Sequence, residues 1–204
     1  MVVRRDPDQT RQKLLCAAFE EIHRNGFRAA SVDSILASTG VTKGALYHHF
    51  SSKTELGYAV VEELIAHHIA ERWIQPLEEA ENPIDALIEL LRSVGKEWAP
   101  VACHIGCPLN NLAQEMSPVD EGFRKRILAV YESWRGGIAE ALRRGQGKGL
   151  VRPDIDRQQV AYFLIAGFEG AAGMAKATQD PAVLDGCLAN ARRYLETLRV
   201  PSTP

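Results

Sequence analysis

The stretch from Ser31 to Glu55, SVDSILASTGVTKGALYHHFSSKTE, constrains the fold more than any other part of the chain. It consists of two short segments joined at Gly40, followed by the run Ser52–Glu55, which matches the capping box at the start of a helix. Gly40 can adopt the positive φ that a sharp corner between two helices requires. We therefore expect a helix-turn-helix followed directly by a third helix.

The second short segment, TKGALYHHF, has two distinct faces. Thr42 is its expected N-cap, and Leu46 and Phe50 lie four residues apart on the side that should enter the core. The opposite side is cationic at its start, small in its first turn and aromatic in its middle, and it contains Lys43, Gly44, Ala45, Tyr47 and His48. A backbone without bulky side chains can approach a DNA groove, and polar tips can reach phosphates or base edges. On an isolated helix this face would be an ordinary polar surface; the turn and caps beside it favour a DNA-reading helix.

A longer helix should precede this unit. Asp6-Pro7 is a favourable start, and Leu14, Leu15, Ala18, Phe19 and Ile22 follow at the spacing of one buried face. Asn25-Gly26 should end the helix, and Ser31 should cap the next one. The capping box at Ser31 is incomplete, because Ser34 stands where Glu or Gln would complete it.

The run from Thr10 through Leu56 resembles the N-terminal domain of the TetR family of bacterial transcriptional regulators. Leu36 departs from the alanine that is usual in that family, which affects packing rather than DNA contact. The residues that carry the resemblance are Thr10, Ala17, Ala18, Phe19, Gly26, Ser31, Val32, Ile35, Ala37, Gly40, Val41, Thr42, Lys43, Gly44, Leu46, Tyr47, His49, Phe50, Lys53 and Leu56. The resemblance implies DNA contacts at Ser31, Thr42, Lys43, Ala45, Tyr47, His48 and Lys53, to which the small side of the reading helix adds Gly44. We also expect the Arg4-Arg5 arm to hold phosphates.

The rest of the chain reads as helices separated by proline and glycine. We expect Pro76 and Pro100 to stop helices, Pro108 and Pro118 to open them, and the glycines from 145 to 149 to break a long helix into a loop. The prediction is an all-α fold, with a three-helix DNA-binding domain at residues 1–56 and a larger helical domain for ligand binding and dimerisation at residues 57–204.

The last two predicted helices, about residues 157–178 and 181–199, are candidates for a homodimer interface. The first is rich in glycine and alanine, which allow close helix approach, and the second carries a near-heptad stripe of Leu184, Leu188, Ala191, Leu195 and Leu198. The stripe could equally fill the core of its own chain. Two DNA half-sites need a two-fold protein, and this favours the dimer.

A regulator of this shape is expected to hold a mostly apolar ligand pocket with a few polar groups. The candidates are Trp98, Cys103, Cys107, Asn110, Tyr131, Trp134, Phe168 and Glu169. The aromatic members could equally be ordinary core residues. The inducer is expected to be a small molecule, which the sequence leaves unidentified.

The segment from Cys103 to Pro108, CHIGCP, offers two thiols and an imidazole, one ligand short of a closed zinc shell. Cys107 precedes Pro108 at a helix start, where the helix dipole favours a thiolate, so a redox or electrophile sensor is a second interpretation. The glycine-cysteine pair also resembles a branch of the TetR family that includes electrophile-responsive members. In the third interpretation, Cys107 is a small buried side chain.

Charge and composition separate the remaining functional classes. The net charge of the chain is −2, and residues 1–56 carry 8 Lys and Arg against 6 Asp and Glu, a mild excess with the sign that a DNA-facing unit needs. No signal peptide, membrane span or disulfide framework is evident, so we expect a cytoplasmic protein without a membrane partner or cofactor. A helical enzyme with Glu169 and His104 as acid and base lacks any supporting nucleophile or phosphate loop, and a protein-interaction module is a further alternative. The leading hypothesis is a ligand-responsive repressor that binds a palindromic operator as a dimer and is released by a small-molecule or electrophilic inducer. An activator is the alternative, since the sign of regulation depends on the position of the operator.

Overall fold

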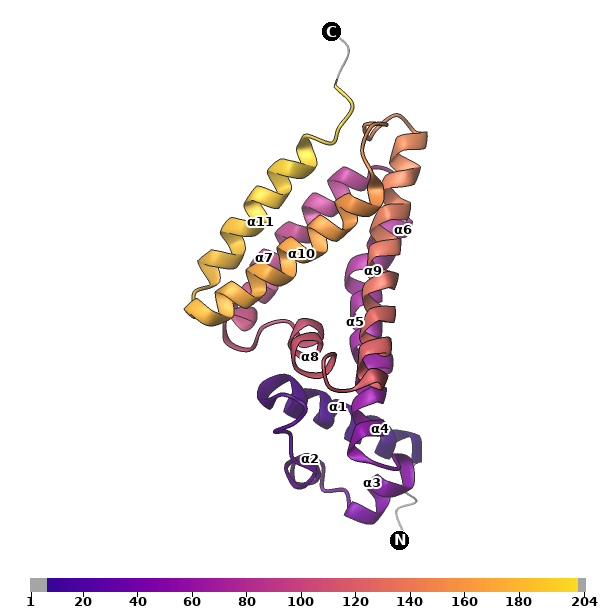
Figure 1. Cartoon of the computed structure of the whole chain (residues 1–204), viewed down its shortest axis with the longest axis vertical. Coiled ribbons are helices and arrows are strands. Elements are labelled where there is room, and N and C mark those ends of the chain that lie inside the picture. The colour runs from indigo at the N-terminus through magenta and orange to yellow at the C-terminus, as the bar shows by residue number, and fades with distance from the viewer. Residues whose placement is uncertain (1–6, 202–204) are drawn as a thin grey trace. The chain divides into compact units, whose positions relative to one another are not determined.

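The computed structural model describes residues 7–201 and divides the chain into two compact units. The N-terminal unit comprises Met1–His67 and Pro108–Val130, and the C-terminal unit comprises His68–Cys107 and Tyr131–Pro204. Helices dominate both units, as Figure 1 shows. Because no strand occurs in residues 7–201 apart from one isolated bridge, the predicted all-α fold is confirmed.

The N-terminal unit is built around the helix-turn-helix. Its helices are α1 (Pro7–Asn25), α2 (Val32–Thr39), α3 (Lys43–His49), α4 (Lys53–Ala59), the π-helical segment η1 (Val60–Ile65) with the start of α5 (Ala66–Ile69), α8 (Pro108–Met116) and the first part of α9 (Glu121–Gly147). Helix α1 ends at Asn25 as predicted, and its apolar face is buried, with Leu14 and Leu15 fully enclosed. The expected cap at Asp6 and the Arg4-Arg5 arm lie outside the described residues. The proposed boundary between residues 56 and 57 stays a prediction.

The cap of α2 is completed from a neighbouring helix. The Ser31 hydroxyl accepts the Ser34 N–H at 3.4 Å, which satisfies one orphan donor at the helix start. The Ser31 N–H in turn donates to the carboxylate of Glu21 in α1 at 3.2 Å. Glu21 therefore supplies the carboxylate that the sequence lacks at position 34.

The helical path that starts at Lys53 continues to Glu78, so the prediction that Pro76 stops it is wrong. After α4 it passes through a π-helical segment η1 (Val60–Ile65), α5 (Ala66–Ile69), a second π-helical segment η2 (Ala70–Ile74) and α6 (Gln75–Glu78). Pro76 stands in the first turn of α6, where its missing N–H is tolerated.

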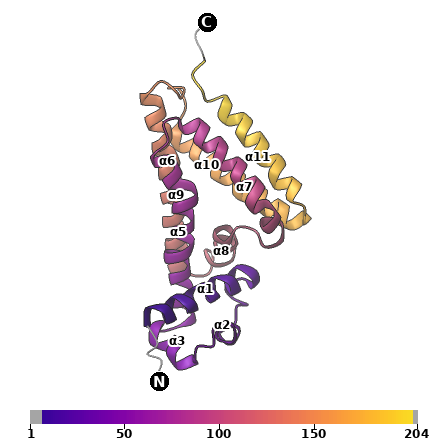
Figure 2. The same ribbon diagram turned by 180° about the vertical axis from the view of Figure 1, so that it is seen from behind.

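The C-terminal unit places three long helices side by side, as both views show (Figures 1 and 2): α7 (Pro83–Ile105), α10 (Arg157–Thr178) and α11 (Pro181–Glu196). The Asp156 and Asp180 carboxylates cap α10 and α11. Among residues 7–201, no helix is long and apolar enough to cross a membrane.

Three further helix boundaries differ from the prediction. Pro100 lies inside α7 rather than at its end, because packing of the buried side chains on both sides of it outweighs the lost hydrogen bond. Helix α9 starts at Glu121 instead of Pro118, since the Asp120 carboxylate accepts the Phe123 N–H at 2.9 Å. The same helix includes Gly145, where a Cβ would come within 2.6 Å of Pro83, so this glycine serves close packing.

Candidate DNA-reading face and regulatory cluster

The corner between α2 and α3 has the geometry that its residues predict. Gly40 has φ 65° and its N–H donates to the Leu36 carbonyl at 3.0 Å, which closes α2 in the left-handed conformation. Thr42 then begins α3, and its hydroxyl accepts the Ala45 N–H at 3.3 Å. The two helices are thus held at a fixed angle by local hydrogen bonds.

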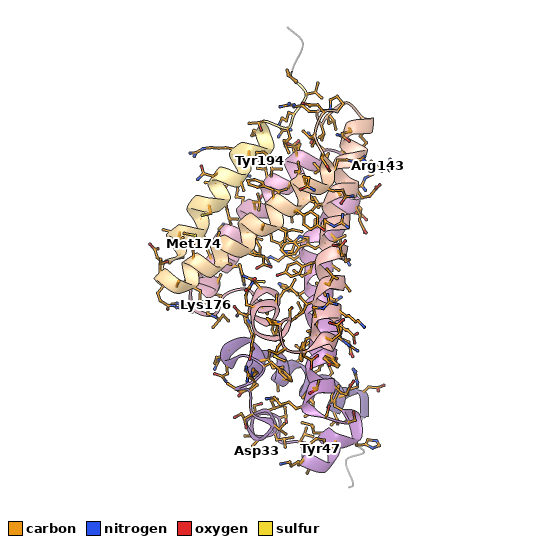
Figure 3. All side chains as sticks on the ribbon, viewed as in Figure 1. Asp33, Tyr47, Arg143, Met174, Lys176 and Tyr194 are labelled. Atoms are coloured by element: carbon orange, nitrogen blue, oxygen red, sulfur yellow. The ribbon has the colours of Figure 1, made fainter. Side chains whose placement is uncertain are left out.

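Helix α3 separates its faces as expected. Leu46 is fully buried and Phe50 is 4% exposed, whereas Tyr47 is 44% exposed. At Gly44 a Cβ would meet no atom within 4 Å, so the backbone there is open. Figure 3 shows Tyr47 at the end of the N-terminal unit, together with Asp33 of α2. Thr42, Lys43 and His48 are exposed on the same helix.

The remaining predicted DNA-contact residues have partners within the unit. Lys43 Nζ lies 3.7 Å from Oδ1 of Asp33, and both side chains are largely exposed. Lys53 Nζ donates to the Arg28 carbonyl at 3.2 Å and lies 4.9 Å from the centre of the Phe27 ring. The Ser31 and Thr42 hydroxyls accept helix-cap hydrogen bonds. A phosphate would therefore have to compete with weak, solvent-exposed contacts.

An aromatic cluster occupies the centre of the C-terminal unit. The Phe168 ring lies 5.4 Å from Trp98, 5.7 Å from Trp134 and 4.9 Å from Trp73. Trp98, Trp134 and Phe168 were predicted to line a pocket, whereas Trp73 was not. Trp134 is 1% exposed, and its Nε1 finds no acceptor among the described residues. A buried indole N–H of this kind can serve an acceptor on a ligand.

Beside these aromatic residues, three titratable side chains share one environment. The Cys107 thiol donates to Oε1 of Glu169 at 3.4 Å, and both residues are buried. Burial raises the pKa of Glu169 to about 7, an effect that the Cys107 hydrogen bond partly opposes. Burial, followed by the nearby Glu169 and Cys107, also raises the pKa of Tyr131. The cluster therefore holds a carboxyl group that titrates near neutral pH next to a thiol.

Cys103 and His104 have hydrogen-bond partners outside this cluster. Cys103 donates to the Pro100 carbonyl at 3.2 Å, and His104 Nδ1 lies 3.0 Å from Oε1 of Gln179. These separate partners argue against a shared metal site with Cys107, and no group of three metal-binding side chains occurs in the described part of the chain. Asn110, a further predicted pocket residue, lies on α8 and belongs to the N-terminal unit.

The exposed face of α10 consists of apolar and small residues. Tyr162, Phe163 and Met174 are about half exposed, at 48%, 55% and 58%. The small residues of the same face are Ala166, Gly167, Gly170, Gly173 and Ala177, all exposed. The leucines of the α11 stripe, in contrast, are buried within their own chain, at 3% exposure or less, so that stripe is core and is not the surface left for a partner. A hollow of about 250 Å³ between α7, α10 and α11 is lined by Phe163, Phe168 and Cys187, among others.

A buried-core helix-turn-helix with an open, polar reading face, followed by a larger helical region, defines a DNA-binding transcriptional regulator. Comparison with known proteins agrees. Residues 14–60 match the bacterial regulatory proteins of the tetR family, and residues 83–191 match the tetracyclin repressor-like C-terminal domain. The chain belongs to the TetR family, whose members are transcriptional regulators and not enzymes.

Individual relatives span most of this chain. An uncharacterized HTH-type transcriptional regulator from the lacX 3′ region of Lactococcus lactis is 31% identical, covering 86% of this chain and 88% of its own. The HTH-type transcriptional repressor DhaR of Mycobacterium sp. strain GP1 is 28% identical over 79% of each chain. The crystal structure of a TetR regulator from Chloroflexus aurantiacus is 26% identical, has a TM-score of 0.83, and covers 96% of this chain and 98% of its own.

Proposed function

We propose that the protein is a dimeric repressor that binds a palindromic operator and is released by a small-molecule or electrophilic inducer. The observation that carries this proposal is the α3 face, where Tyr47 and His48 are exposed beside the open backbone of Gly44 and opposite the buried Leu46. The similarity to DhaR, a transcriptional repressor, supports the direction of regulation. Such a regulator acts in the cytoplasm.

In this proposal each α3 enters a major groove. Thr42, Lys43, Gly44 and Ala45 meet the DNA at the helix start, and Tyr47 and His48 reach base edges. Lys53 at the start of α4 and Ser31 at the start of α2 hold phosphates, aided by the free N–H groups of those helix ends. Lys53 would exchange the Arg28 carbonyl for a phosphate oxygen.

Electrophoretic retardation of the upstream region of the protein's own gene tests the proposal. A shift at low salt without inducer is expected, and its absence would contradict DNA binding. Lys53→Ala should weaken binding to all sequences and reduce the salt slope by about one phosphate. Tyr47→Ala and His48→Ala should cost more on the operator than on random DNA. Lys125→Ala, which removes an exposed lysine from α9, is the charge-matched control and should change neither the affinity nor the salt slope.

We place the dimer interface on the exposed face of α10, with α11 beside it. Two half-sites one DNA turn apart, about 34 Å, require a second copy of the chain. An uncharged helical face with half-exposed Phe163 and Met174 is the kind of surface that a partner covers. The small residues Gly167, Gly170 and Gly173 allow a second α10 to approach closely.

The inducer is proposed to act on the C-terminal unit near Cys107. The aromatic residues provide apolar walls, Trp134 a buried donor and Cys107 a nucleophile next to a carboxylate that can take its proton. Alkylation or oxidation of Cys107 would then weaken operator binding. Cys107→Ser should keep DNA affinity but lose release by N-ethylmaleimide, with Cys16→Ser, which removes an exposed thiol, as the control. An unchanged response in Cys107→Ser would contradict the sensor role.

A further inference from the structure

The carboxylate of Glu115, near the end of α8, accepts two hydrogen bonds from the turn between α1 and α2. Its Oε2 accepts the Phe27 N–H at 2.7 Å, and its Oε1 accepts the Arg28 N–H at 2.8 Å. Each oxygen thus serves one of two successive backbone amides. Hydrogen bonds to an ionised acceptor are roughly twice as strong as neutral ones, so this contact between segments 87 residues apart is a firm attachment.

The turn is shaped to receive that carboxylate. Gly26 has φ 81°, in the left-handed region, and successive amides after such a residue form a concave site for an anion. A Cβ at position 26 would lie 2.9 Å from Oε2 of Glu115. Glycine is therefore needed here twice, once for the backbone conformation and once for the approach of Glu115.

The same turn is held from its other side. Lys53 donates to the Arg28 carbonyl, and the Phe27 ring packs against Phe123 at 4.6 Å between ring centres. The chain then runs directly from Arg28 into the Ser31 cap of α2, and α2 leads through the Gly40 corner into α3. The position of the turn consequently sets the position of the reading helix.

Helix α8 is continuous from Pro108 to Met116, and the residue before it is Cys107. One of the three points at which the chain passes between the two units is the Cys107–Pro108 peptide bond. Cys107 contacts Glu169 in the C-terminal unit, whereas Glu115 contacts the α1–α2 turn in the N-terminal unit. A short unbroken helix moves as one body, so a displacement of its first residue is carried to its last turn.

We propose that Glu115 is a positioning residue that couples α8 to the reading head, which we define as the helix-turn-helix of α2 and α3 (residues 32–49). Through the two hydrogen bonds of Glu115, a change in the C-terminal unit moves the Gly26–Arg28 turn, and with it α2 and α3. The proposal rests on the proposed function as a regulator of DNA binding. To that function this proposal adds the residue that passes a conformational change of the C-terminal unit to the DNA-binding helices. Glu115 touches neither DNA nor inducer.

Glu115→Gln is the variant that isolates the coupling. It keeps the shape of the side chain but turns one acceptor oxygen into a donor NH₂, which faces a backbone N–H and cannot bond it. Leu109, Leu112 and Met116, which anchor α8, remain buried and unchanged. The reading head should stay folded while its attachment to α8 is weakened.

Coupling is reciprocal, so it can be read without knowing the inducer: operator binding at α3 must change the C-terminal unit. The experiment is amide hydrogen exchange of the full-length protein with and without operator DNA. In the wild type, operator should change the exchange of α10 amides by at least about fivefold, and in Glu115→Gln by less than about twofold. Both proteins should show operator protection in α2 and α3.

Glu121→Gln is the matched control, because it removes the same charge from an exposed carboxylate that pairs with Arg124 on α9. In Glu121→Gln, operator should change the hydrogen exchange of the α10 amides as much as in the wild type. Glu115→Asp gives a second test that retains the charge, because its shorter side chain cannot reach both amides. In this variant, operator should change the hydrogen exchange of the α10 amides less than in the wild type.

The proposal is overturned if Glu115→Gln and Glu115→Asp transmit the α10 change as fully as the wild type, or if the wild type binds operator without any α10 change. Loss of operator binding in Glu115→Gln with an unchanged melting temperature would also overturn it, since Glu115 would then build the reading head itself. A wild-type protein that does not bind operator would instead contradict the proposed function, and this proposal with it.

Discussion

Tyr58 donates a hydrogen bond from its hydroxyl to Oδ1 of Asp120 at 2.7 Å, and the same oxygen accepts the Phe123 N–H at 2.9 Å. One carboxylate therefore caps α9 and ties it to α4. The Phe123 amide, followed by the Tyr58 hydroxyl, lowers the pKa of Asp120. A carboxyl group with a lowered folded-state pKa stabilises the fold above its ordinary pKa, and this stabilisation is lost as the pH falls.

Tyr58→Phe removes the hydroxyl and should reduce the free energy of unfolding at pH 7 by about 1 kcal/mol. The difference from the wild type should shrink as the pH falls below about 4, the ordinary pKa of an aspartate, towards the lowered pKa of Asp120 in the folded protein. Urea unfolding at the two pH values measures both effects. Tyr47→Phe, at an exposed hydroxyl, is the control and should leave stability unchanged at either pH.

Gly44→Ala should leave the fold intact, and can stabilise α3 by up to about 1 kcal/mol, because alanine favours helix and the Cβ meets open space. Operator affinity should nevertheless fall, since the methyl group would hold the backbone away from the groove. Gel retardation and urea unfolding separate the two effects. An operator affinity equal to that of the wild type would show that the backbone at Gly44 stays distant from DNA.

Gly57→Ala, in contrast to Gly44→Ala, should reduce the free energy of unfolding. Its Cβ would lie 2.5 Å from Cε2 of Phe27 and 2.7 Å from Cζ of Phe123, which is impossible without a shift of buried rings. Overpacking of this kind costs about 1–3 kcal/mol, to be measured by urea unfolding. An unfolding free energy equal to that of the wild type would mean that the rings move at no cost.

Glu169→Gln tests the buried carboxyl group beside Cys107. Because burial raises its folded-state pKa to about 7, the folded protein binds a proton more tightly than the unfolded chain. Wild-type stability should therefore fall as the pH rises from about 4.5 to about 7, by as much as about 3 kcal/mol. The variant should lack this decline and be the more stable protein at pH 8.

Thermal unfolding between pH 4 and pH 8 measures the Glu169 effect. Glu121→Gln is the control, since its carboxylate is exposed, its pKa is lowered by Arg124, and it stays ionised throughout most of this range. Parallel wild-type and Glu169→Gln curves would contradict the raised pKa.

Phe163→Glu should dissociate the proposed dimer, because it places a charge in the centre of the exposed apolar face of α10. Sedimentation analysis should show a monomer with normal helix content and weakened operator binding. Leu128→Glu, which changes an equally exposed leucine on α9, should leave the dimer intact. Dissociation by both variants, or by neither, would place the interface elsewhere.

The reading head could be predicted from sequence because short-range chemistry builds it. Gly40 needs only its own φ, and Thr42 and Ser52 cap helices that begin at the next residue. Leu46 and Phe50 share a face because of their spacing alone. Proline and glycine were less informative. Pro76 stands in the first turn of α6, where proline is tolerated, and Pro100 and Gly145 lie inside helices because packing of neighbouring side chains outweighs their local cost.

The sequence by itself determined the caps of α2, α3 and α4 and the faces of the helices, because each depends on residues within one or two helical turns. It also identified the family, from the motif between Thr10 and Leu56. Only the tertiary structure decided that Glu21 completes the cap at Ser31 and that Trp73 belongs to the aromatic cluster. It also decided that the leucines of α11 are buried in the core of their own chain. It also brought Cys107 to Glu169 and Glu115 to Phe27, which are 62 and 88 residues apart. Contacts at such separations depend on how whole helices pack, and no local pattern of residues encodes that packing.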